Sequence, residues 1–117
     1  MLPERLARLP LRTLPGGLVV LQAVTLRSRL HGLAGCRALA PGHALLLAPC
    51  ASVHTLGMRF ALDLVWLDAD GAVLALCAEL APRRVAGHRG ARAVLEARAG
   101  EGAAFADALR DAAGRER

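Results

Sequence analysis

The sequence has no Lys and no Tyr, and its 117 residues include only two Phe and one Trp. So few aromatic rings leave little with which to stack nucleic-acid bases. They also require a core of aliphatic side chains, which the 23 Leu and 25 Ala can supply. All 15 basic residues are Arg, dispersed along the chain among 10 acidic residues. The net charge of +5 permits anionic partners, but the composition predicts no nucleic-acid partner.

Paired cysteines are also missing. Cys36, Cys50 and Cys77 are odd in number and form no CxxC pair, so the sequence indicates neither a disulfide framework nor a zinc knuckle. The N-terminal apolar run lacks the small-residue cleavage site of a secretory signal, and no apolar stretch reaches the roughly 18 residues that a transmembrane helix needs. We therefore expect a soluble cytoplasmic protein with no membrane partner and no cofactor.

Pro and Gly residues indicate how the chain is organised. Residues 1–17 contain three Pro and the Gly16–Gly17 pair, which predict a loosely ordered lead segment. A single β-rich domain is predicted over residues 18–102, followed by a short helix and tail over 103–117. Within the domain, apolar runs predict strands near 18–24, 44–49 and 92–97, and helical spacing predicts a short helix over 24–33.

The clearest predicted element surrounds the sequence DADG, residues 68–71. Two apolar runs flank it, and a Gly-containing connection of this length between such runs predicts a β-hairpin. Both arms are apolar on both faces, so we expect the hairpin at the centre of a sheet. Short strands that recur about every ten residues favour a mainly β fold, an antiparallel β-sandwich or partly closed barrel with one or two short helices.

Reactive side chains are concentrated in CASVHTLGMRF, residues 50–60. Because side chains alternate between the faces of a strand, an unbroken strand would place on one face Cys50, Ser52, His54, Met58 and Phe60. Cys50 and His54 would then lie roughly 13 Å apart, too far for a nucleophile and its base, so a catalytic Cys50/His54 pair requires a turn between them. Cys50, His54 and Met58 could instead form a soft metal site, but structural zinc needs a fourth ligand, and no metal is predicted. The remaining interpretation is ordinary core packing.

Asp63 lies inside the apolar run FALDLVWL. A buried carboxylate requires a partner, and Arg59 and His54 are the nearest candidates in sequence. The alternative is a solvent-facing position at the start of a strand, where charge is common.

The stretch PRRVAGHRGARA, residues 82–93, has no acidic residue. Its guanidinium groups could hold a carboxylate or phosphate, or the stretch could be a solvated loop. The candidate anion-binding residues are Arg83, Arg84 and Arg89.

The stretches CASVHTLGMRFALDLVWLDADGAVL and AVLEARAG together resemble a bacterial and archaeal family, the domain of unknown function 192 (DUF192). The similarity runs from about Leu18 to about Gly102, and it includes the Asp within a hydrophobic strand and the later VLE strand. It implies a compact, mainly β domain with no assigned activity, cofactor or partner. The family tends to end in a further strand, which this chain does not show after Gly100, so the resemblance implies an open sheet edge.

These observations favour a non-enzymatic domain that binds a small molecule or a protein partner. The predicted pocket is formed by His54, Asp63, Met58 and Arg59, with Ser52 and Thr55 as further ligand-binding candidates. The alternatives are an enzyme that uses Cys50 and His54, and a metal-binding protein with a Cys, His and Met ligand set.

Overall fold

The computed structural model of the chain describes residues 11–23, 40–48, 52–54, 61–81 and 84–115. In chain order, its elements are β1 (Leu11–Leu14), β2 (Leu18–Ala23), β3 (His43–Leu47), β4 (Ser52–His54), β5 (Leu62–Leu67), β6 (Val73–Leu80), β7 (Val85–Gly87), β8 (Ala93–Arg98) and α3 (Gly102–Arg115). No helix within the described ranges combines the length and the hydropathy that crossing a bilayer requires.

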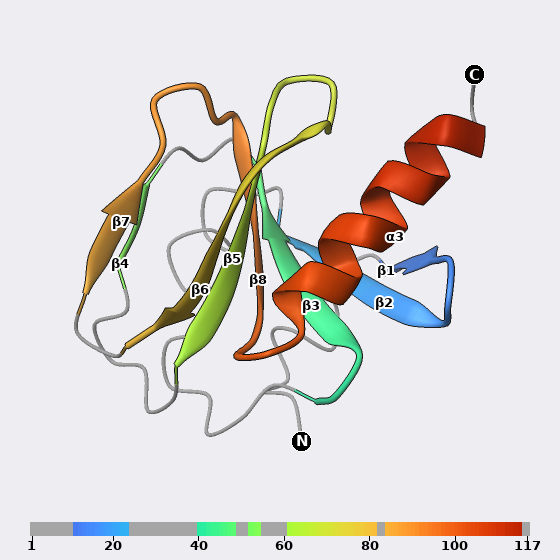
Figure 1. The fold of residues 1–117 in the computed structure, drawn as a ribbon, viewed down its shortest axis with the longest axis horizontal. Helices are drawn as coiled ribbons and strands as arrows, with labels where there is room; N and C mark the ends of the chain where they lie inside the picture. The colour runs from blue at the N-terminus through green and yellow to red at the C-terminus, as the bar shows by residue number, and fades with distance from the viewer. Residues whose placement is uncertain (1–10, 24–39, 49–51, 55–60, 82–83, 116–117) are drawn as a thin grey trace.

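Six strands form an open mixed sheet in the order β1-β2-β3-β8-β5-β6. Strands β2 and β3 run parallel, and the other neighbours pair antiparallel. Strands β4 and β7 form a separate two-stranded antiparallel ribbon. Figure 1 shows the ribbon and α3 on opposite sides of the six-stranded sheet.

The helix α3 covers one face of the sheet through a single apolar stripe. Phe105 is fully buried, and Ala106 and Leu109 are buried, whereas Asp107 and Arg110 are exposed. This stripe packs on the side chains that alternate strand positions direct to that face, among them Val65 and Leu95. We call this side of the sheet the helix face.

A second apolar cluster fills the opposite face, which we call the ribbon face. Its buried members include Leu45, Leu64, Trp66 and Val94, and Ala86 of β7 packs against them. Because both faces of the sheet are covered, every residue of β5 is buried. The core is therefore mainly aliphatic on both sides of the sheet, as the composition predicts, with Trp66 on one face and Phe105 on the other.

The β5–β6 hairpin has the turn that its sequence predicts. The Asp68 carboxylate accepts hydrogen bonds from the backbone N–H groups of Asp70 and Ala72, both at 2.9 Å. Gly71 adopts a φ of +82°, a conformation that glycine allows at low energetic cost. The DADG sequence is thus explained by turn geometry.

The mainly β fold class is confirmed, and so are the strands predicted near 18–24, 44–49 and 92–97 and the helix near the C-terminus. The predicted helix over 24–33 lies outside the described residues. The partly closed barrel is wrong, because the six-stranded sheet has two edges, β1 and β6. The expectation of antiparallel pairing fails for β2 and β3, which are parallel.

Two further expectations are corrected. Residues 11–14, placed in the loosely ordered lead segment, form the edge strand β1, because Gly16 and Gly17, at φ values of +86° and +78°, turn the chain back onto β2. The β5–β6 hairpin is not central as a whole: β8 flanks β5, but β6 is the other edge of the sheet, and its residues alternate between exposed and half-buried. The exposed leucines of β6, Leu74 and Leu76, made an edge strand look like a buried one in the sequence.

Replacing Trp66 tests the placement of β5. Trp66 is 3% exposed and contributes to the apolar cluster of the ribbon face. We expect Trp66→Ala to lower the free energy of unfolding by about 3 to 5 kcal/mol, measured by urea denaturation. Leu74→Ala on β6, where the side chain is 40% exposed, is the matched control and should change stability much less; equal effects would contradict the packing described above.

Candidate functional site

Asp63 on β5 is held by the backbone. Its side chain is 2% exposed. Its Oδ1 accepts a hydrogen bond from the Glu79 N–H at 2.8 Å, and its Oδ2 accepts from the N–H groups of Gly100 at 3.0 Å and Gly102 at 2.8 Å. The solvent-facing position considered for Asp63 is therefore wrong. His54 and Arg59 were the predicted partners of Asp63, and their side chains are not among those that the structure describes.

The three donors to Asp63 come from separate parts of the fold. Glu79 lies in a β-bulge of β6, where the register against β5 shifts, and its φ of +56° is unusual for a residue with a side chain. Gly100 lies in the turn after β8, and Gly102 is the first residue of α3. A Cβ on Gly102 would lie 2.6 Å from the Asp63 Cβ, so this approach requires glycine. Asp63 thus joins the hairpin, the turn and the helix, and its contacts assign it a structural role.

Glu96 on β8 is the other buried acidic residue, and its surroundings are different. It is 5% exposed and lies two residues after Val94, a member of the cluster on the ribbon face. Because strand side chains alternate, Glu96 also belongs to the ribbon face. Its cross-strand neighbours are Leu45 on β3 and Leu64 on β5.

The neighbours of Glu96 extend into a row across five strands. Successive register pairs join these residues in the order Leu21, Leu45, Glu96, Leu64 and Cys77. We call these five residues the Glu96 row. Its members other than Glu96 and Cys77 are buried leucines, and Cys77, on the edge strand β6, is half-buried.

Within the described ranges, the neighbours of the Glu96 carboxyl are therefore apolar side chains. Among the described residues, none donates a hydrogen bond to it or forms an ion pair with it. Burial raises the pKa of Glu96 from 4.5 to about 7, since the apolar surroundings disfavour the charged form. A buried carboxyl with such a pKa is a feature that recurs in functional sites.

The described part of the CASVHTLGMRF motif is β4. Ser52 is exposed, and position 54 pairs with Val85, whose side chain is 76% exposed. The middle pair of the ribbon joins Val53 to Ala86, and Ala86 packs toward the sheet. Ser52, which pairs with Gly87 next to Ala86, therefore lies on the ribbon face that points away from the sheet. Cys50, Thr55, Met58, Arg59 and Phe60 lie outside the described residues, so their predicted roles stay predictions.

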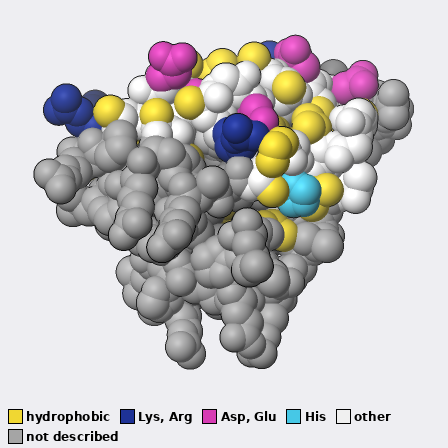
Figure 2. Space-filling view, turned by 90° about the horizontal axis from the view of Figure 1, so that it is seen from below, with side chains coloured by type: hydrophobic (Ala, Val, Ile, Leu, Met, Phe, Trp, Pro, Cys, Tyr) yellow, Lys and Arg dark blue, Asp and Glu magenta, His cyan; other side chains and the backbone are white. Residues whose placement is uncertain are grey.

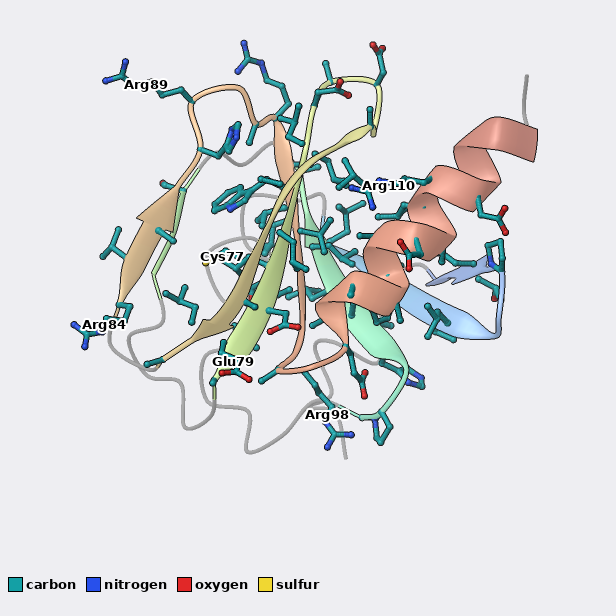
Figure 3. The ribbon with its side chains drawn as sticks, viewed as in Figure 1. Cys77, Glu79, Arg84, Arg89, Arg98 and Arg110 are labelled. Atoms are coloured by element: carbon teal, nitrogen blue, oxygen red, sulfur yellow. The ribbon has the colours of Figure 1, made fainter. Side chains whose placement is uncertain are left out.

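The two candidate anion-binding arginines that the structure describes, Arg84 and Arg89, do not lie together. Figure 3 shows Arg84 and Arg89 at opposite ends of β7, pointing away from the sheet and not toward a common point, and both side chains are exposed. Arg83 lies outside the described residues. Figure 2 shows acidic and basic side chains interspersed with hydrophobic ones on the described part of its face. This arrangement does not support a shared anion site of Arg84 and Arg89.

A separate cavity of about 180 Å³ lies on the helix face, near the DADG turn. Its lining includes Leu67, Leu95 and Leu109, and the turn residues Asp68 and Asp70 lie at its polar end. The Asp68 carboxylate already accepts two backbone hydrogen bonds. In the described part of the chain, no group of three or more His, Cys, Asp or Glu residues is arranged to hold a metal ion.

Comparison with known proteins now identifies the family. The sequence profile of DUF192, described as an uncharacterised ACR, matches residues 16–106. The chain belongs to the DUF192 family. No curated protein matches the chain significantly.

Two solved structures share the fold of this DUF192 chain. One is a candidate transcription regulator from Sinorhizobium meliloti, with a TM-score of 0.67, 24% identity and 81% of each chain covered. The other is a protein of unknown function from Novosphingobium aromaticivorans, with a TM-score of 0.66, 18% identity and coverage of 90% of this chain and 92% of that one. At such identities the likeness establishes the fold and leaves the function open.

The sequence reasoning did not select Glu96 as a site residue. Glu96 is the E of the VLE stretch. A single acidic residue that directly follows an apolar run is the sequence feature that could have identified it. Its significance depends on β8 being central with both faces covered, which only the strand order of this DUF192 domain reveals.

Replacing Asp63 tests its structural role. We expect Asp63→Asn to lower the free energy of unfolding by about 3 kcal/mol, because an amide NH₂ cannot accept the hydrogen bonds that one carboxylate oxygen accepts now. Asp70→Asn is the control, since Asp70 is an exposed turn residue. Urea denaturation of both variants is the measurement; an Asp63→Asn protein as stable as the control would contradict the role assigned to these three hydrogen bonds.

The raised pKa of Glu96 predicts how stability depends on pH. The folded state holds the Glu96 proton up to about pH 7, whereas the unfolded chain releases it near pH 4.5. Between these values the folded state binds more protons, so the contribution of Glu96 to stability falls as pH rises and levels off only when Glu96 is fully ionised in the folded state, well above its pKa of about 7. The loss is about 3 kcal/mol.

The measurement is the free energy of unfolding from pH 4 to pH 8 for the parent and for Glu96→Gln. Subtracting the variant's curve from the parent's isolates the Glu96 titration from those of the other groups. A difference that does not change with pH would show that Glu96 titrates alike in the folded and unfolded states.

Proposed function

We propose that this DUF192 protein is a non-enzymatic module that binds a small ligand on the ribbon face of its sheet, with Glu96 as the polar anchor. The observation that carries the proposal is a carboxyl group in the middle of a six-stranded sheet, 5% exposed, with apolar cross-strand neighbours and no hydrogen-bond donor among the described residues. Binding sites of this kind are mostly apolar and contain a few placed polar groups.

Stability does not account for Glu96. A buried carboxyl that is not hydrogen-bonded loses the hydration it has in the unfolded chain, and an apolar side chain of similar volume would avoid that loss. Asp63 shows the contrast, because three backbone donors satisfy its oxygens. We therefore assign Glu96 to binding and Asp63 to the frame that supports the sheet.

Distance argues against catalysis by the described reactive groups. Cys77 and Glu96 lie on either side of Leu64 in the Glu96 row, and two strand spacings separate them by about 10 Å. A proton can pass directly only over hydrogen-bond distances of about 3 Å. Cys77 and Glu96 therefore do not form a nucleophile and base pair.

The CASVHTLGMRF motif supports a site on the same side of the sheet. Its described strand, β4, pairs with β7, and Ala86 of β7 packs against the apolar cluster of the ribbon face. The ligand-binding roles of His54, Met58, Arg59 and Thr55 are part of this proposal. A ligand-binding role of Asp63 is not, because backbone donors already occupy both of its oxygens.

Replacing Glu96 by Leu separates binding from structure. We expect Glu96→Leu to raise the free energy of unfolding at pH 8 by roughly 1 to 3 kcal/mol, since it removes an unsatisfied buried carboxyl, and to abolish binding of fragments that raise the melting temperature of the parent. Thermal denaturation with a set of small polar fragments, confirmed by ligand-observed NMR, is the measurement.

Glu79→Gln is the matched control, because it removes an exposed carboxyl from β6 and should leave fragment binding intact. A Glu96→Leu protein less stable than the parent would mean that Glu96 is a structural residue. Fragment binding that survives Glu96→Leu would place the ligand elsewhere.

A further inference from the structure

We infer that the ligand of the Glu96 row is a small organic amine, bound as its ammonium form against the Glu96 carboxylate. This inference rests on the proposed function and specifies the class of ligand. It follows from the one polar group and the apolar side chains that the row contains.

The apolar surroundings of Glu96 favour a positively charged ligand. In a medium of low dielectric constant, a cation has a far more favourable electrostatic interaction with a carboxylate than a neutral hydrogen-bond donor has, and an anion is repelled. An amine can also take the proton that burial keeps on the carboxyl, so that the pair becomes ammonium and carboxylate together. A ligand with a cationic end therefore matches the carboxyl group of the row.

The other described charges near this face do not neutralise Glu96. Arg98 follows Glu96 by two residues on β8, but its Nη1 lies 3.6 Å from Glu101 Oε2. His88 lies against Trp66, with the ring centroids 6.3 Å apart, and the His43 Nδ1 lies 2.9 Å from the Pro41 carbonyl oxygen. Each of these groups has a contact of its own, and none of them forms an ion pair with Glu96.

Cys77 provides a probe at the open end of the row. It is half-buried on the edge strand β6, and Figure 3 shows it projecting on the side where the ribbon lies. A reagent that reaches the Cys77 sulfur stands about two strand spacings, or about 10 Å, from Glu96. If Glu96 dominates the electrostatic potential on this face, the charge of the reagent should therefore change the rate at which it reacts with Cys77.

The experiment compares two methanethiosulfonate reagents, one carrying an ammonium group and one carrying a sulfonate. Labelling of Cys77 is followed at pH 8 on the full chain by peptide mass spectrometry, and each rate is divided by the rate with N-acetylcysteine amide. We expect the ammonium reagent to be favoured by about tenfold or more in the parent, as two unit charges at this spacing in a partly buried site allow. Glu96→Gln should remove most of this preference.

Glu79→Gln is again the matched control, because Glu79 is the acid nearest to Cys77 in sequence and is exposed. The amine inference predicts that this variant keeps the preference of the parent. A preference lost in Glu79→Gln, or one unchanged in Glu96→Gln, would overturn the inference.

A second variant, Glu96→Leu, replaces Glu96→Gln in the test if the latter folds poorly. It should lose the preference for the ammonium reagent in the same way. If neither Glu96 variant folds, Glu96 is structural and the proposed function fails with the inference. If fragment binding depends on Glu96 but the reagents show no charge preference, the proposed function stands and the ligand is a neutral hydrogen-bond donor.

Discussion

The hydrogen bonds of Asp63 are the interaction on which the rest of this structure depends. One buried carboxyl group accepts from Glu79 in a bulge, from Gly100 in a turn and from Gly102 at the start of α3. Glu79 is far in sequence from Gly100 and Gly102, and all three are far from Asp63, so the carboxyl group fixes the hairpin, the end of β8 and the helix relative to one another. The bulge needs such support, because a residue with a side chain at positive φ is held only where its surroundings determine it. An acid placed near the amide groups that begin a helix is also favoured by the helix dipole.

The two buried acids lie on neighbouring positions of adjacent strands and on opposite faces of the sheet. Asp63 pairs across the sheet with Ala97, and Leu64, the residue after it, pairs with Glu96. Asp63 faces α3, and both of its carboxylate oxygens accept hydrogen bonds. Glu96 faces the ribbon side, among leucines. Burial is nearly equal for the two residues, so burial alone does not separate a structural acid from a site residue. The presence of described donors around one carboxyl group, and not around the other, is the observation that separates them.

Much of the sheet could be predicted from local patterns in the sequence. The DADG turn, the apolar runs of β2, β3, β5 and β8, and the spacing of Phe105 and Leu109 on α3 each have a local physical cause. Strand β1 and the edge position of β6 could not be predicted, because they depend on long-range pairing. Prolines surround β1, and the exposed Leu74 and Leu76 give the edge strand β6 the composition of a buried one. The role of Asp63 was equally hidden, because its donors lie 16, 37 and 39 residues away in sequence.

The position of Glu96 also explains why binding and stability can be separated in this domain. From the helix face, Asp63 holds β5, β6, the turn after β8 and the start of α3 relative to one another, so this part of the frame under the Glu96 row needs no contribution from the Glu96 carboxyl. A site residue carried by a rigid sheet can be unfavourable for folding and still be positioned well, because its neighbours fix its backbone. The free energy that the unsatisfied carboxyl removes from the folded state is available to a ligand that satisfies it. Binding of a cation should therefore stabilise the folded protein most at the pH values where the ionised Glu96 destabilises it.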